Sequence, residues 1–309
     1  MLLSALSLSA QAQSAEAPPA SEREVLLSVR VTTDHGLPIN GLKAEQFKLT
    51  SEKKTLPITS FSDRDEPASI VFLVDVSGSM AISGHEGNKL QYALRGLQGF
   101  LQNGNDANEY SILAFHTESN LALDWTRDQN AVGRTMAKLA LQSVKGQTAF
   151  YDACRQGMGL AQRGKHRRKI ILLLSDGGDT ASKERRFGKL KNEVRAGEAV
   201  FYALNIVSPA DGSPNADGRN ATEELTKLTG GQVFFPARQV DVDAGFELLA
   251  KLIRNEYVVG FKTAVADDKW YEVKIEIKLS PDAPRELKFP LVKHRGGFQG
   301  NFDRVARTP

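Results

Sequence analysis

The sequence predicts an α/β fold in which a doubly wound, mostly parallel sheet is inserted into a small β-sandwich-like module formed by the two flanks of the chain. Two observations predict this arrangement. Between about residues 68 and 255, uninterrupted apolar runs alternate with segments of helical spacing, the pattern of a parallel sheet covered by helices on both faces. On either side, residues 25–31 and 271–278 alternate apolar and polar side chains, which indicates half-buried strands.

The N-terminal residues predict an export signal. Residues 1–12 combine a short apolar run with the small-x-small pattern Ala10-Gln11-Ala12, typical of a signal-peptidase site, although no positive residue precedes the run. Residues 13–22 are a polar, Pro/Ala-rich linker. We therefore expect a secreted or periplasmic protein; the alternative is a ragged N-terminus that stays in the cytosol.

The two flanks are expected to fold together, because each offers only about three short strands and needs a cover for one apolar face. The first flank, 24–62, contains expected strands at 25–33, 47–50 and 57–61. The second flank, 256–293, contains expected strands at 256–262, 270–279 and 287–292, with a turn at 280–282. Residues 294–309 are expected to be a C-terminal tail.

The central stretch, 66–255, supplies the elements of the doubly wound sheet. Each strand is expected where an apolar run is continuous, and each helix where apolar residues recur every three to four positions. The expected strands are 69–74, 110–115, 169–174, 199–206 and 232–235, and the expected helices are 90–101, 132–141, 150–161, 184–196, 221–229 and 241–254, the last with Asp241 as its N-cap.

Charge and composition exclude several classes of function. The 309 residues carry 40 Lys and Arg against 37 Asp and Glu, a net charge of +3 that gives no reason to expect nucleic acid as a partner. No apolar run is long enough for a stable transmembrane segment. The basic run 165–169 is expected to be a solvated loop; the alternative is a site for an anionic partner. The single cysteine, Cys154, is expected to be a buried small apolar residue; the alternative is a reactive thiol.

Oxygen-bearing side chains follow two of the buried strands. Asp75, Ser77 and Ser79 come directly after the first strand, and Asp176 follows the strand at 169–174. Because ligands of open α/β sheets bind beyond the carboxyl ends of the strands, these groups are expected to converge. Thr148, in a glycine-bearing loop before a helix, offers one more hydroxyl; the alternative is that it only caps that helix.

The three elements together, D-x-S-x-S, the threonine loop and S-D-G, resemble the metal-ion-dependent adhesion site of von Willebrand factor type A domains. The resemblance covers about 68–255 and extends, through Gly146 to Ala153 and the flanking β segments, to a bacterial family of exported proteins related to that domain. It implies that the hydroxyls of Ser77, Ser79 and Thr148 bind a metal ion directly. It also implies that Asp75 and Asp176 act largely through water or at one direct position.

Hard oxygen ligands of this kind favour Mg²⁺, with Mn²⁺ or Ca²⁺ as alternatives. The resemblance implies a binding module that captures an Asp or Glu carboxylate of a partner protein through the open position of the ion. One alternative is a metal-dependent hydrolase, which would need a general base that the sequence does not mark. Another is a subunit of an envelope assembly or maturation complex. We expect a protein that is not an enzyme; the sequence does not indicate its oligomeric state.

Overall fold

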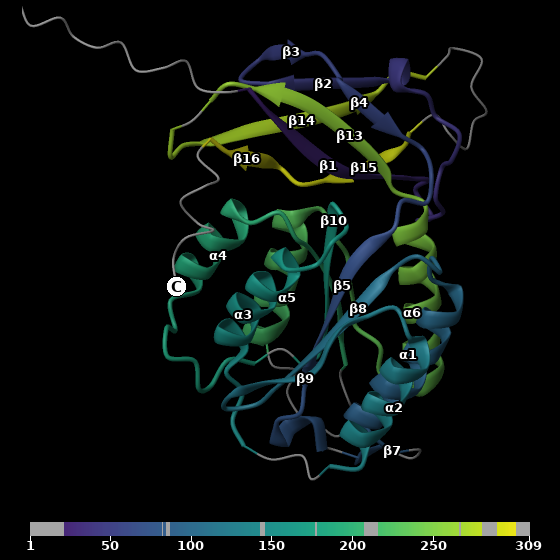
Figure 1. Ribbon diagram of the computed structural model, residues 1–309, viewed down its shortest axis with the longest axis vertical. Helices are drawn as coiled ribbons and strands as arrows, with labels where there is room; N and C mark the ends of the chain where they lie inside the picture. Colours follow the sequence, from purple (N-terminus) through teal and green to yellow (C-terminus); the bar gives the residue numbers. More distant parts are fainter. Residues whose placement is uncertain are drawn as a thin grey trace, which may run out of the picture.

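The computed structural model describes residues 22–81, 83–84, 87–142, 146–176, 178–206, 216–265, 267–279 and 289–300 (Figure 1). The predicted signal segment, nearly all of the predicted linker and the turn at 280–282 lie outside these residues. None of the described helices is both long and apolar enough to cross a membrane.

The central sheet has six strands, and five of them are parallel. Its order is β12-β11-β10-β5-β8-β9. The strands are β5 (Ala68–Asp75), β8 (Glu109–Phe115), β9 (Ser119–Thr126), β10 (Arg168–Ser175), β11 (Val200–Asn205) and β12 (Val233–Phe234). The doubly wound, mostly parallel sheet predicted from the sequence is therefore confirmed.

Helices cover both faces of this sheet (Figure 1). One face is covered by α1 (Lys89–Asn103), α2 (Gln129–Ala140) and α6 (Gln239–Arg254), and the other by α3 (Phe150–Gln162), α4 (Phe187–Ala196) and α5 (Ala216–Thr229). In β5, Phe72 packs into the first core, whereas Val71 and Leu73 pack into the second. Both faces of the strand are buried, which explains why its apolar run is uninterrupted.

The flanks form two four-stranded sheets with one shared core. The first has the order β15-β1-β13-β4 and the second β16-β14-β2-β3. Their strands are β1 (Arg23–Thr32), β2 (Phe47–Ser51), β3 (Lys54–Leu56), β4 (Ser60–Ser62), β13 (Tyr257–Thr263), β14 (Trp270–Ile277), β15 (Leu291–His294) and β16 (Gly297–Gln299). Each sheet contains strands from both flanks, so the composite β module is confirmed.

Several predicted elements are wrong in detail. The strand expected at 57–61 begins later than expected, as β4 from Ser60 to Ser62, and a further strand, β3, precedes it at Lys54–Leu56. The expected tail contains the end of β15 and all of β16, which pairs with β14. The N-cap of α6 is Arg238 rather than Asp241, whose carboxylate lies in the first turn and accepts a hydrogen bond from the Arg238 guanidinium at 2.8 Å.

The β module covers the end of the central sheet at which the parallel strands begin, so the strands end at the opposite pole of the molecule (Figure 1). At that distal pole lie the 3-10 turn η2 (Gly78–Ala81) and the small hairpin of β6 (Ser83–Gly84) and β7 (Gly87–Asn88). The predicted site residues therefore lie far from the module.

Candidate functional site

The turn that follows β5 holds Asp75 in a fixed position. This side chain is fully buried, and both of its carboxylate oxygens accept hydrogen bonds. The backbone N–H of Ser77 donates to Oδ1 at 2.8 Å, and the Ser175 hydroxyl, at the end of β10, donates to Oδ2 at 2.6 Å. The carboxylate thus links the ends of two neighbouring parallel strands.

A chain of oxygen atoms extends from this turn to the end of β10. The hydroxyls of Ser77 and Ser79 lie 3.2 Å apart, and the Ser79 hydroxyl donates to Oδ1 of Asp176 at 3.0 Å. The structure therefore brings together Asp75, Ser77, Ser79 and Asp176, four of the five residues expected at the site.

The loop that carries Thr148 lies against the same turn. The backbone N–H of Gly78 donates to the Gly146 carbonyl at 3.0 Å, and Gly146 has a φ of +87°, which favours glycine. Thr148 is held by its backbone, since its N–H donates to the Thr180 hydroxyl at 2.9 Å. Ala149, not Thr148, is the N-cap of α3, so the alternative role of Thr148 as a helix cap is wrong.

The donor set fits a small divalent cation. Oxygens around an octahedral Mg²⁺ at about 2.1 Å lie about 3 Å from one another, close to the spacing along Ser77, Ser79 and Asp176. Within the described chain, no cluster of three or more His, Cys, Asp or Glu could hold a metal. The candidate site therefore depends on hydroxyls together with two carboxylates, a combination suited to a hard ion.

The surroundings of Asp75 disfavour the charged form of its carboxylate. Burial, and in second place the charge of Asp176, raises the pKa of Asp75 to about 6, while the hydrogen bonds from Ser175 and Ser77 act in the opposite direction. A divalent cation placed among these groups would offset both effects, because it favours the charged form of Asp75.

Sequence reasoning missed one charged residue at the site. Lys89, the first residue of α1, extends its ammonium group to Oδ2 of Asp176 at 3.0 Å, and its side chain is only 3% exposed. Lys89 and Asp176 are 87 residues apart, and a lysine at a helix start has no local pattern that marks such a contact.

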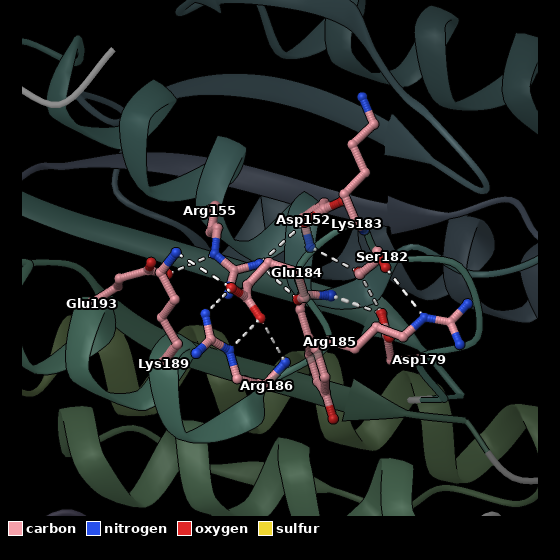
Figure 2. Close-up of polar contacts among 11 residues, drawn as sticks. Asp152, Arg155, Asp179, Ser182, Lys183, Glu184, Arg185, Arg186, Lys189 and Glu193 are labelled. Atoms are coloured by element: carbon pink, nitrogen blue, oxygen red, sulfur yellow. Dashed lines mark hydrogen bonds and ion pairs between the residues drawn. The ribbon is translucent and has the colours of Figure 1, made fainter.

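Two nearby carboxylates have other roles (Figure 2). Asp179 accepts a hydrogen bond from the backbone N–H of Tyr151, in the first turn of α3, at 3.2 Å. Asp152, in that same turn, pairs with Arg155 at 3.1 Å and accepts from the backbone N–H of Lys183 at 2.7 Å. Both carboxylates therefore stabilise the start of α3 and the loop that packs on it, as expected for N-terminal carboxylates.

Comparison with known proteins gives one family match. Residues 70–178 match the family model of the von Willebrand factor type A domain, a range that includes all five predicted site residues. No curated protein matches the chain.

Solved structures give similarity in fold alone. The D319A mutant of the PilB minor pilin from Streptococcus sanguinis is 12% identical, with a TM-score of 0.51 over 74% of this chain and 78% of that one. The conserved hypothetical protein BatB from Bacteroides thetaiotaomicron is 14% identical, with a TM-score of 0.48 over 60% of this chain and 98% of that one. An aerotolerance-related membrane protein from Bacteroides fragilis is also 14% identical, with a TM-score of 0.49 over the same shares of the two chains.

Proposed function

We propose that this chain, which contains a von Willebrand factor type A domain, uses that domain to bind a partner protein through one divalent cation. Domains of this family generally mediate protein interactions. The observation that carries the proposal is the row of oxygen atoms from Ser77 through Ser79 to Asp176, spaced about as in the shell of a small ion, at the open end of the sheet.

The protein residues would hold the ion on one side only. The hydroxyls of Ser77, Ser79 and Thr148 would bind it directly, and Asp75 and Asp176 would act largely through water or at one direct position. Because three of these five donors are neutral, a bound Mg²⁺, or Mn²⁺ or Ca²⁺ in its place, would keep enough positive charge to attract an Asp or Glu carboxylate of the partner.

The direct test is metal binding by two variants at the site. We expect wild-type protein to bind one Mg²⁺ or Mn²⁺ in calorimetry, and Asp75→Ala and Thr148→Ala to lose binding while keeping near-native circular dichroism. Asp34→Ala, which removes an exposed carboxylate of the β module, is the matched control and should bind as wild type. Metal affinity that is unchanged in both site variants would refute the proposed site.

The carboxylate of the partner is tested separately. Proteins captured from the native envelope by wild-type protein in Mg²⁺ should be released by EDTA and should not be captured by Asp75→Ala. Substitution of the Asp or Glu residues of a captured protein by Asn or Gln should then abolish binding. Capture that is insensitive to EDTA would show that the domain binds partners without the ion.

The alternative function, a metal-dependent hydrolase, is tested by the hydrolysis of model substrates. We propose that the protein is not a hydrolase, because the oxygen cluster supplies a cation site but no recognisable nucleophile and base pair. Ester, phosphoester and peptide substrates should remain intact in the presence of Mn²⁺. Turnover that disappears in Asp75→Ala would favour the metal-dependent hydrolase instead.

The proposed location is the periplasm or the cell exterior, where the protein could act alone or as a subunit of an envelope assembly complex. This part of the proposal is supported by the apolar segment and small-x-small pattern of residues 1–12. Fractionation of cells that express the full sequence tests it, since retention in the cytosol would contradict an exported binding protein.

A further inference from the structure

Lys89 occupies a position that its own helix does not favour. It is the first residue of α1, after the N-cap Asn88, where the positive end of the helix dipole opposes a cation. Burial of its side chain carries a further cost, because an ammonium group without a partner is poorly tolerated away from water. The contact with Asp176 offsets both costs.

Asp176 divides its two oxygens between the site and Lys89. Oδ1 accepts the hydrogen bond from Ser79, and Oδ2 forms the ion pair with the lysine. The ammonium group is thus a cation placed beside the same carboxylate that would serve a divalent ion. Two cations that share one carboxylate repel each other, and this repulsion is strong where water is largely excluded.

We propose that Lys89 is a built-in counterion of Asp176, which a divalent ion has to displace from this carboxylate in order to bind. The inference rests on the proposed function and concerns the regulation of the same site. Lys89 sets metal affinity below the value that the oxygen cluster alone would give. Its charge also offsets the repulsion between the carboxylates of Asp75 and Asp176 when no divalent ion is bound.

The test is the metal affinity of a variant without the charge. Calorimetric titration of Lys89→Met with Mg²⁺ and with Mn²⁺ should give a Kd at least about tenfold lower than that of wild type. Damage to the fold would change affinity in the opposite direction, so tighter binding identifies the effect of the charge. Lys138→Met, which removes an exposed lysine on α2, is the matched control and should bind as wild type.

Thermal unfolding supplies a second measurement that does not depend on calorimetry. In EDTA, Lys89→Met should melt at a lower temperature than wild type, because Asp176 has lost its counterion. Saturating Mg²⁺ should then raise the melting temperature more in the variant than in wild type. Lys89→Gln, which keeps a polar group, should show both effects in weaker form and provides a second variant if Lys89→Met folds poorly.

The possible outcomes separate this inference from the proposed function. Equal metal affinity of wild type and Lys89→Met overturns the counterion and leaves the metal site intact. Weaker binding by both folded Lys89 variants also overturns it, because Lys89 would then assist the ion. If neither wild type nor Lys89→Met binds a divalent ion, the proposed function itself is wrong and the counterion role is refuted with it.

Discussion

The two ends of the central sheet hold buried polar groups with opposite balances of charge. At the end covered by the β module, the guanidinium groups of Arg30 and Arg168 surround one carboxylate, that of Glu256. At the distal end, the carboxylate of Asp75 lies near that of Asp176, which pairs with the one ammonium group there, that of Lys89. The first cluster has one positive charge in excess, and the second has one negative charge in excess.

The chain itself completes the first cluster. Arg30 donates to the Tyr202 hydroxyl at 2.8 Å and to the Gly231 carbonyl at 2.9 Å. Arg168 donates to Glu256 and to the Ile253 carbonyl, both at 2.7 Å. Neutral carbonyls thus satisfy the extra positive charge. The distal cluster has a surplus of negative charge instead, which the proposed divalent cation would offset. The first cluster therefore joins the β module to the α/β domain, whereas the charge of the distal cluster suits a cationic ligand.

The largest effect on stability is expected when a charge is removed from the cluster of Arg30, Arg168 and Glu256. Glu256→Ala leaves two buried guanidinium groups without their carboxylate and should lower the free energy of unfolding by about 3–5 kcal/mol in a denaturant titration. Glu247→Ala, which removes an exposed carboxylate from α6, is the control and should change stability little. A loss below about 1 kcal/mol for Glu256→Ala would show that the cluster does not hold the domains together.

Removal of a carboxylate from the distal cluster should instead increase the stability of the protein. In EDTA at pH 7, Asp75→Asn should raise the free energy of unfolding by about 1–3 kcal/mol, because the folded protein holds this carboxylate at a raised pKa of about 6. An acid with a raised pKa binds its proton more readily when folded. The ionised Asp75 carboxylate therefore lowers the free energy of unfolding of wild type. This loss is zero below about pH 4 and reaches its full value above about pH 6.

Chemical denaturation at pH 4 and at pH 7 checks this prediction. The gain in stability of Asp75→Asn over wild type should shrink towards zero at the lower pH. An Asp75→Asn protein that is less stable than wild type at pH 7 would mean that the carboxylate contributes more through its hydrogen bonds than it costs by burial.

The smallest effect is expected on Mg²⁺ affinity when the β module is removed altogether. We propose domain boundaries near residues 66 and 255, and a chain of residues 66–256 retains every predicted ligand as well as Lys89. It loses Arg30 and Arg295, the latter of which donates to the Arg195 carbonyl at 2.8 Å, so its stability should fall. Its Mg²⁺ affinity in calorimetry should stay within about threefold of the full chain, a difference below about 0.7 kcal/mol. Loss of binding by a folded fragment would show that the two ends are coupled.

Local pattern was sufficient to predict the central strands and most of the candidate site. The apolar runs at 69–74 and 169–174 predict strands buried on both faces, and residues at the ends of neighbouring parallel strands must lie close together. The positions of Asp75, Ser77, Ser79 and Asp176 near one another therefore follow from the sequence. By contrast, β9 was missed, because it is an antiparallel edge strand that is largely half-buried or exposed.

The charged clusters could not be predicted, because they join residues that are distant in the sequence. Arg30 and Tyr202 are separated by 172 positions, and no local spacing indicates their contact. The basic run 165–169 was expected to be a solvated loop, which is wrong for Arg168: its neighbour Arg167 is exposed and pairs with Glu24, whereas Arg168 is buried against Glu256. A charged run just before a buried strand can thus contain both exposed and buried charged residues, and only tertiary contacts distinguish them.

Insertion of the α/β domain into the β module determines how force would travel through the molecule. The chain passes between the two at residues 63–67 and again at Asn255 and Glu256, both at the end opposite the site. Arg23 and Gln299, in β1 and β16, are in direct contact on the module. A partner that pulled on the distal pole would therefore load two covalent connections in parallel. A pair of parallel connections resists torque as well as tension, so the proposed binding face would keep its direction relative to the module under load.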